Sequence, residues 1–297
     1  MTYDPHALAA SLDAAESALL GEEMRSTVLA HDAPAERVTV LLHGLTASPR
    51  TWRDFARARY ERGENVLVPR LPRHGHADRM TEALARLHAA ELRAFGARMV
   101  DAASALGRRI VVVGHSMGGA LALHLAQHDR RVERAVAIAP FIGIRPLPHG
   151  WHAVVLRAVE RAPNVFLWWD PVGRGRNLPP HGYARYTTRS LVAGISLGDA
   201  LRASAREAPP RASHVEIVRN ADETSISNRT IDDLVRRWRE AGATNVHVHR
   251  LTGLGPSHDI VEPDLRRGAA RRFLPRLHGL LDADPPERDL AIDVNEP

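Results

Sequence analysis

Residues 110–123 read IVVVGHSMGGALAL, and this stretch decides the fold. Its apolar start is typical of a buried β-strand, and its alanine- and leucine-rich end is typical of a helix. Gly114 and Gly118 flank Ser116 and allow the sharp strand-to-helix turn that lifts a serine hydroxyl above a sheet edge. We therefore interpret Ser116 as a candidate nucleophile, with a serine that only caps the following helix as the alternative.

Strands and helices alternate on both sides of this stretch. Predicted strands cover residues 37–44, 109–116, 134–140, 214–220 and 245–251, with a further short strand at the start of residues 65–79, and predicted helices cover 5–26, 81–106, 117–128, 228–241 and 262–281. Because the strands are apolar throughout, they predict a mainly parallel sheet covered by helices on both faces. The fold class is α/β.

The alternation stops between residues 141 and 212, where the chain is rich in proline, tryptophan and tyrosine. A segment of this length with short helical patterns is expected to be an insertion, not a loop. We therefore expect an N-terminal helical segment (1–35), a core (36–140 and 213–281), a mostly helical insertion (141–212) and a C-terminal tail (282–297).

A serine hydroxyl needs a base and an orienting carboxylate to act as a nucleophile. His258, in GPSHD, follows the last predicted strand, whereas the alternatives His249 and His278 fall within a strand and a helix. Asp222, in NADE, stands where the preceding strand ends and is the expected acid. The adjacent Glu223 is the alternative acid.

Acyl transfer also needs donors for the oxyanion that forms on the carbonyl. The backbone N–H of Met117, directly after the candidate nucleophile, is one candidate. The second is the N–H of Leu45, because the strand that ends in LLHGL exposes it toward the same edge. An ordinary strand-ending turn at residues 43–44 is the alternative.

The motifs HGLTASP, PRLPRHGH, GHSMGG, NADE and GPSHD occur in this order, and the sequence resembles the α/β-hydrolase superfamily over about residues 36–280. Within it, the chain resembles the carboxylesterase, monoacylglycerol lipase and lysophospholipase-like group. The resemblance implies the α/β-hydrolase fold, a catalytic triad of Ser116, Asp222 and His258, and an oxyanion hole at Leu45 and Met117. Leu45 stands where many relatives have an aromatic residue, and NADETSIS is one residue longer than the common form.

The resemblance also implies that the insertion is a cap above the nucleophile. Its aromatic residues are candidates for an acyl or aryl pocket or a lipid contact, with packing of the cap onto the sheet as the alternative. These residues are Trp151, Trp168, Trp169, Tyr183 and Tyr186.

Composition excludes some classes of function. The chain has 297 residues and no cysteine, so it has no disulfide, thiolate metal site or cysteine nucleophile. Its net charge of +5 comes from arginines spread along the chain, which does not favour nucleic-acid binding. No long apolar run predicts a transmembrane segment, and no secretory signal is apparent, so a cytoplasmic location is the default expectation.

Together these features predict a serine hydrolase that cleaves carboxylic esters of small molecules or acyl lipids. No metal or organic cofactor is expected. The alternatives are a thioesterase, amidase, C–C hydrolase or perhydrolase with the same triad, a non-catalytic ligand-binding protein on the same fold, and a purely structural domain.

Overall fold

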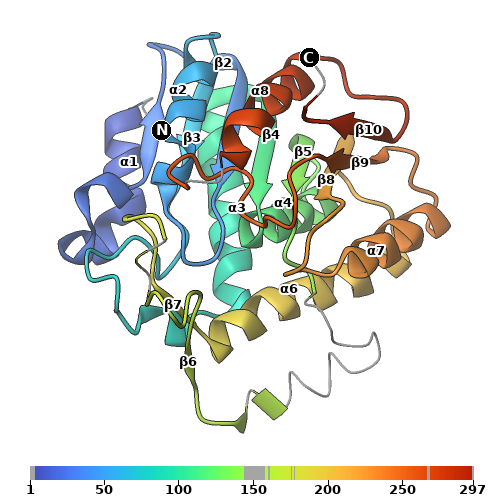
Figure 1. The fold of residues 1–297 in the computed structure, drawn as a ribbon. Helices are drawn as coiled ribbons and strands as arrows, with labels where there is room; N and C mark the ends of the chain where they lie inside the picture. The colour runs from blue at the N-terminus through green and yellow to red at the C-terminus, as the bar shows by residue number, and fades with distance from the viewer. Residues whose placement is uncertain are drawn as a thin grey trace.

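An eight-stranded sheet forms the centre of the protein in the computed structural model, with strand order β1-β3-β2-β4-β5-β8-β9-β10 (Figure 1). The strands are β1 (Thr27–Leu29), β2 (Ala35–Leu42), β3 (Asn65–Val68), β4 (Gly107–His115), β5 (Val132–Ile138), β8 (His214–Asn220), β9 (Val246–Thr252) and β10 (Leu290–Asp293). Neighbouring strands are parallel except for β1, which pairs antiparallel with β3. The structure describes residues 4–143, 158–159, 161–174, 176, 178–265 and 268–295. The predicted α/β fold with a mainly parallel sheet is confirmed.

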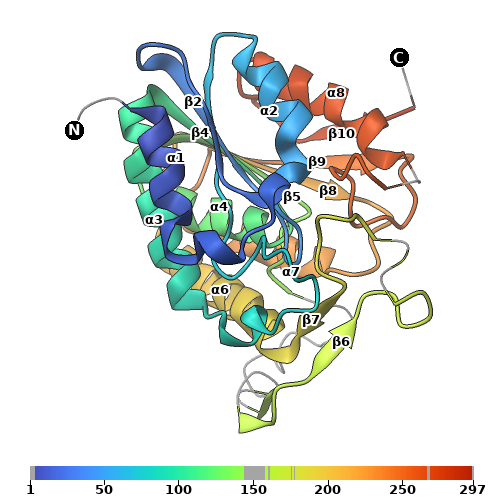
Figure 2. The same cartoon turned by 90° about the vertical axis from the view of Figure 1, so that its left-hand side faces the viewer.

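Helices cover both faces of this sheet, as Figure 2 shows. Helices α2 (Arg53–Tyr60) and α8 (Ala269–Asp282) pack on one face. The other face carries α1 (Pro5–Asp13), α3 (Ala89–Leu106), α4 (Met117–His128), α6 (Thr188–Glu207) and α7 (Asn228–Glu240). The central strands β2 and β4 are therefore covered on both sides, which explains their runs of buried apolar residues.

The apolar residues of strand β4 contribute to the hydrophobic cores on both faces of the sheet. Successive side chains of a strand point to opposite faces, so Ile110 and Val112 join the core under α3 and α4. Val111 and Val113 join the core under α2 and α8. All four side chains are at most 2% exposed.

The described part of the insertion contains an antiparallel two-stranded ribbon, β6 (Phe166–Trp168) and β7 (Arg185–Thr187), followed by α6. The sequence predicted a mostly helical insertion, with no strand identified here. Thr187 and Ser190 form a capping box at the start of α6, which fixes where the ribbon becomes helix. The long helix α6 also packs against α4 and α7 in the main body.

Elements at the two ends of the chain differ from their predictions. The N-terminal helix ends at Asp13, and two 3₁₀ helices (Ala14–Leu19 and Glu22–Met24) and strand β1 follow. Two further 3₁₀ helices, Pro49–Trp52 and Ala83–Arg86, precede α2 and α3. The predicted tail adds β10 to the sheet edge. No described helix is both long and apolar enough to cross a membrane.

Candidate active site

Ser116 occupies a sharp turn between β4 and α4, with φ 54° and ψ −114°. This conformation is uncommon for a residue with a side chain, so close packing must maintain it. A Cβ atom at Gly114 would lie 2.1 Å from the Gly118 carbonyl oxygen, and one at Gly118 would lie 2.3 Å from that of Leu42. Both glycines are needed for space. The Ser116 side chain makes no capping hydrogen bond to α4, so the helix-cap alternative is wrong.

His258 lies beside this serine, in the loop after β9, with its Nε2 atom 2.9 Å from Ser116 Oγ. Two buried side chains hold the loop. Asn220 Nδ2, at the end of β8, donates hydrogen bonds to the carbonyl oxygens of Gly255 (2.7 Å) and Ser257 (2.9 Å). His115 Nε2 donates to the carbonyl oxygen of His258 at 3.0 Å. The predicted histidine is thus within hydrogen-bond reach of the predicted serine.

Glu223, and not Asp222, completes the chain of contacts. Its Oε2 atom lies 2.7 Å from His258 Nδ1, and its side chain is fully buried. Asp222 is exposed at the tip of a turn in which the Glu223 N–H donates to the Asn220 carbonyl oxygen at 3.3 Å. The expectation that Asp222 faces the histidine is therefore wrong. The turn points residue 222 to solvent and returns residue 223 toward the sheet edge.

The protonation of this group follows from its contacts. Because a carboxylate only accepts, His258 Nδ1 carries the proton that is donated to Glu223, and Nε2 is left to accept from the Ser116 hydroxyl. Burial lowers the pKa of His258, but the hydrogen bond to Glu223 and the negative charges of Asp259 and Glu223 together outweigh burial and raise the pKa above its ordinary value. Burial raises the pKa of Glu223, but the hydrogen bond and charge of His258, with backbone hydrogen bonds from Ser225 and Ile226, together outweigh burial and lower the pKa. The pair therefore favours an ionised Glu223 beside a basic imidazole.

The loop after β2 also lies close to the serine. A Cβ atom at Gly44 would lie 3.2 Å from the Cβ of Ser116. His43 Nε2 accepts from the Leu71 N–H at 3.0 Å, so its Nδ1 is protonated and donates to the Gly44 carbonyl oxygen at 2.9 Å. The Ala47 N–H donates to the same oxygen at 3.3 Å. Burial lowers the pKa of His43 well below its ordinary value, which is consistent with this neutral form.

These bonds restrain the direction of the Leu45 N–H from the side of Gly44, because this N–H belongs to the same planar peptide unit as the Gly44 carbonyl and points the opposite way. Met117 is the first residue of α4, so its N–H has no partner within the helix. Among the described residues, no acceptor is paired with either N–H. Leu45 thus follows Gly44, which lies against Ser116, and Met117 directly follows Ser116 at the start of α4.

The candidate pocket residues separate into different environments. Trp151 lies outside the described residues. Trp169, 43% exposed, lies against Tyr186 with ring centroids 4.1 Å apart and the rings tilted by 38°, and its Nε1 donates to Thr46 Oγ1 at 2.8 Å. Trp168 is half-buried in β6.

Tyr183 is buried against the main body. Its hydroxyl accepts from the His76 N–H and donates to the Arg73 carbonyl oxygen, both at 3.0 Å. Because both hydrogen bonds of this hydroxyl go to the 73–76 loop, Tyr183 joins the insertion to the core. This agrees with the alternative that these aromatic residues pack the insertion onto the sheet.

Three positioning contacts could not be identified from the sequence. His115 is the variable second residue of the GHSMG motif, and Asn220 and Thr46 lie within the NADE and HGLTASP motifs, which assigned neither of them a role. The contacts of His115 and Asn220 are with backbone groups of the His258 loop, and Thr46 contacts Leu45 and the insertion. The only local signal was the position of His115 beside the nucleophile.

Two groups of described side chains bring three ligand-type atoms within 4.8 Å, namely His115, His258 and Asp259, and His181, Glu262 and Asp264. In the second group, Glu262 accepts from Thr51 Oγ1 at 2.9 Å and from the Asp264 N–H at 3.1 Å. The Arg50 guanidinium lies 3.2 Å from Asp264. With these contacts the group is a balanced hydrogen-bond network that does not require a cation.

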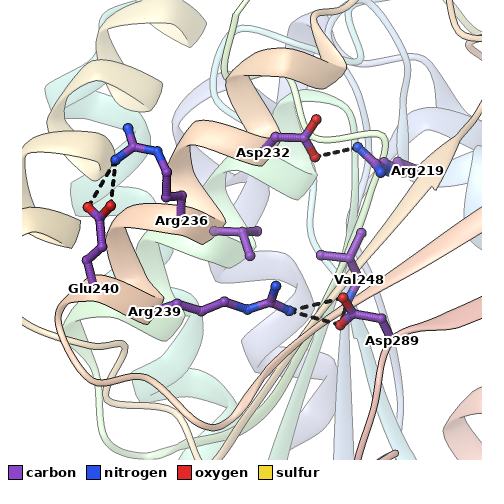
Figure 3. A pocket seen from close by; sticks show the side chains of 8 residues that line it. Arg219, Asp232, Arg236, Arg239, Glu240, Val248 and Asp289 are labelled. Atoms are coloured by element: carbon purple, nitrogen blue, oxygen red, sulfur yellow. Dashed lines mark hydrogen bonds and ion pairs between the residues drawn. The ribbon is translucent and has the colours of Figure 1, made fainter.

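A surface hollow of about 560 Å³ lies over α7, β8 and β9 (Figure 3). None of its lining residues belongs to the loops that carry Ser116, Glu223 or His258. Its charged side chains pair with one another: Arg219 with Asp232, Arg236 with Glu240, and Arg239 with Asp289. Paired charges of this kind leave no unbalanced group to attract a charged ligand.

Comparison with known proteins places this geometry in context. The model of the alpha/beta hydrolase family matches residues 39–284. No curated protein sequence matches the chain. A structure reported for LipS and LipT, two metagenome-derived lipolytic enzymes, has TM-score 0.66 and 17% identity, covering 89% of this chain and 99% of that one.

Two monoacylglycerol lipases have similar structures. That of Paleococcus ferrophilus has TM-score 0.63 and 17% identity, covering 86% of this chain and 97% of that one. The monoglyceride lipase of Saccharomyces cerevisiae, in a soluble variant with a substrate analogue, has TM-score 0.61 and 14% identity, covering 87% and 91%. At these identities the similarity shows a shared fold.

Proposed function

Because the chain belongs to the α/β-hydrolase family, we propose that it is a serine hydrolase that cleaves carboxylic esters through an acyl-enzyme. The observation that carries this proposal is the continuous contact from Ser116 Oγ to His258 Nε2 (2.9 Å) and from His258 Nδ1 to Glu223 Oε2 (2.7 Å). A nucleophile, a base and an orienting acid in this order are the parts that acyl transfer needs.

The first half of the reaction follows from these contacts. His258 Nε2 takes the proton of Ser116 as Oγ attacks the ester carbonyl, and Glu223 stabilises the resulting imidazolium. The carbonyl oxygen becomes an oxyanion that the N–H groups of Leu45 and Met117 stabilise. His258 then gives its proton to the departing alcohol, and the acyl group remains on Ser116.

The second half repeats these steps with water. His258 removes a proton from a water molecule as that water attacks the acyl-enzyme, and the same two N–H groups hold the second oxyanion. The imidazolium returns its proton to Ser116 Oγ, and the carboxylic acid leaves. The proposed chemistry uses no metal and no organic cofactor.

The substrate is proposed to be a small ester or an acyl lipid. Support comes from the contacting rings of Trp169 and Tyr186, of which Trp169 bonds to Thr46 next to Leu45, and from the lipolytic enzymes of similar fold. A panel of p-nitrophenyl esters of increasing acyl length, with a monoacylglycerol, a thioester and an amide, defines the preferred class.

A fluorophosphonate probe tests the mechanism. We expect the purified protein to be labelled on Ser116, and we expect Ser116→Ala to abolish both labelling and ester hydrolysis. Ser11→Ala, at an exposed serine of α1, is the matched control and should behave like the wild type. Hydrolysis that persists in Ser116→Ala would contradict the mechanism, and ligand binding without turnover in the wild type would identify a binding protein.

A further inference from the structure

Thr46, directly after the candidate oxyanion residue Leu45, has a left-handed backbone with φ 67°. Such a conformation is a genuine outlier for a β-branched residue and persists only where its surroundings hold it. Thr46 is 7% exposed. Its surroundings are therefore the contacts that keep this loop in place.

The hydroxyl and the carbonyl oxygen of Thr46 both accept hydrogen bonds from the insertion. The indole Nε1–H of Trp169 donates to Thr46 Oγ1 at 2.8 Å, and the Tyr183 backbone N–H donates to the Thr46 carbonyl oxygen at 2.7 Å. The Thr46 hydroxyl, in turn, donates to the Leu45 carbonyl oxygen at 2.6 Å. A chain of hydrogen bonds thus runs from the indole of the insertion to the backbone of Leu45.

A second contact ties the same stretch of the insertion to both active-site loops. His181 Nδ1 lies 2.9 Å from Ser48 Oγ, two residues after Thr46, and His181 Nε2 lies 3.2 Å from Glu262, four residues after His258. Residues 181–183 therefore contact both the loop after β2, which carries Leu45, and the loop after β9, which carries His258. A shift of this part of the insertion would therefore also move these two loops.

Leu45 is consequently held on both sides of its Cα atom. The peptide before it is fixed through the Gly44 carbonyl, which accepts from His43 and Ala47. The peptide after it is fixed through its own carbonyl, which accepts from Thr46. With both planes fixed, the Leu45 N–H has a single direction, as an oxyanion donor requires.

We propose that Thr46 and Trp169 are positioning residues of the oxyanion hole: the indole N–H of the insertion, acting through the Thr46 hydroxyl, holds the Leu45 N–H toward the oxyanion. This inference rests on the proposed ester hydrolysis. It implies that the insertion contributes to the chemical step as well as to substrate binding.

Three variants test it. Thr46→Val removes the hydroxyl and keeps the shape, Trp169→Phe removes the N–H and keeps a ring against Tyr186, and the third combines both changes. Thr188→Val is the matched control, because the Thr188 hydroxyl bonds only within the insertion, to Asn164 and to the Val165 N–H. Thr46→Ser restores the hydroxyl and should recover activity if Thr46→Val folds.

Loss of an entire oxyanion donor lowers kcat about 10²- to 10³-fold. A misdirected donor should lose less, so we expect kcat to fall about tenfold in each single variant, with KM changed by less than about twofold. Because the indole acts through the hydroxyl, the double variant should be no slower than Thr46→Val. The control should match the wild type.

A thionoester substrate reports the oxyanion directly. The ratio of ester to thionoester rates should fall in Thr46→Val and Trp169→Phe and stay unchanged in Thr188→Val, whereas general loosening of the fold would leave the ratio unchanged. The loss should also be the same for short and long acyl chains. A loss that grows with chain length and appears in KM would overturn the proposal, because Trp169 would then be only a pocket wall.

Circular dichroism and fluorophosphonate labelling accompany each assay. If Thr46→Val does not fold, Trp169→Phe still decides the matter through its kcat and its ester-to-thionoester ratio. A wild type that neither reacts with the probe nor turns over ester would refute the proposed function. If the wild type reacts with the probe and turns over ester, and Thr46→Val and Trp169→Phe have the same kcat and ester-to-thionoester ratio as the wild type, only the role of the insertion is refuted.

Discussion

Replacement of Glu223 by glutamine is the sharpest test of the acid, because its effect can be derived from the hydrogen bonds around it. Glu223 Oε1 accepts from the Ser225 N–H at 2.6 Å, and Oε2 faces His258 Nδ1 at 2.7 Å. In Glu223→Gln the amide oxygen must stay on the Ser225 N–H, so the amide nitrogen faces His258. Two donors cannot face each other, so His258 Nδ1 loses its proton and Nε2 carries it.

A histidine protonated on Nε2 cannot accept the proton of Ser116. In a serine triad, replacement of the acid by its amide lowers kcat about 10⁴-fold for this reason, and we expect a loss of about 10³- to 10⁴-fold in Glu223→Gln. Asp222→Asn makes the same chemical change one residue earlier, on an exposed side chain, and should leave kcat within about twofold of the wild type.

Initial rates of p-nitrophenyl ester hydrolysis measure both variants, with circular dichroism and thermal unfolding as checks on the fold. The pH dependence gives a second readout. Since the pKa of His258 is raised above its ordinary value of 6.5, and only the neutral imidazole acts as a base, the acid limb of kcat/KM in the wild type should lie above pH 6.5. Loss of the Glu223 charge should move that limb to lower pH. If Asp222→Asn loses as much activity as Glu223→Gln, the assignment of Glu223 as the acid is refuted.

Further predictions concern the turn and the core. Gly114→Ala should abolish activity and folding, because its Cβ would lie 2.1 Å from a carbonyl oxygen. Gly279→Ala, in open space within α8, should instead stabilise the protein by about 0.5–1 kcal/mol in urea unfolding. Equal stability of the two variants would contradict the packing argument. Glu216→Gln should lower the free energy of unfolding by about 3 kcal/mol, because the buried Arg134 guanidinium, 2.6 Å from Glu216, loses its counter-charge. Glu133→Gln, at a more exposed pair, should change the free energy of unfolding by less than about 1 kcal/mol. Burial raises the pKa of Glu216, but the hydrogen bonds and charges of His249 and Arg134 together outweigh burial and lower the pKa. The contribution of Glu216 to stability should therefore be complete above pH 4.5 and lost as the pH falls through its lower folded-state pKa. Acid unfolding of the wild type without this pH dependence would contradict the argument.

The central strands and helices were predictable because their sequence signal is local. Helix α4 covers residues 117–128, as predicted, because a glycine-bounded turn starts it and apolar residues fill its length. Strand β8 also has its predicted bounds. These elements are buried on both sides, so nearly every residue in them contributes to the pattern.

The short strands at the edges could not be predicted. Strand β1 has three residues and β10 has four, and no residue in either is fully buried. Each exists because it pairs with β3 or β9, far away in the sequence. The β6–β7 ribbon depends in the same way on a partner about 20 residues distant, so a local pattern does not reveal it.

The choice between Asp222 and Glu223 depended on the turn after β8. The Asn220 side chain bonds to the carbonyls of Gly255 and Ser257, so the strand ends with its last side chain bound to the His258 loop. The chain then turns outward at Asp222 and back at Glu223, whose longer side chain reaches the imidazole. The motif revealed that an acid follows the strand, but only the turn decides which carboxylate points inward.

His115 shows why the variable position of the motif matters to the site. It is buried at the end of β4, and burial lowers its pKa to about 4, so it is neutral near pH 7 and can donate its Nε2–H to the His258 carbonyl oxygen. The residue before the nucleophile therefore holds the backbone of the base, while Asn220 holds the residues just before it. Both contacts start from ends of central strands, so the distance between Ser116 and His258 is set by the sheet and not by the loops alone. A loop fixed in this way keeps the base within reach of the serine while its side chain remains free to exchange protons.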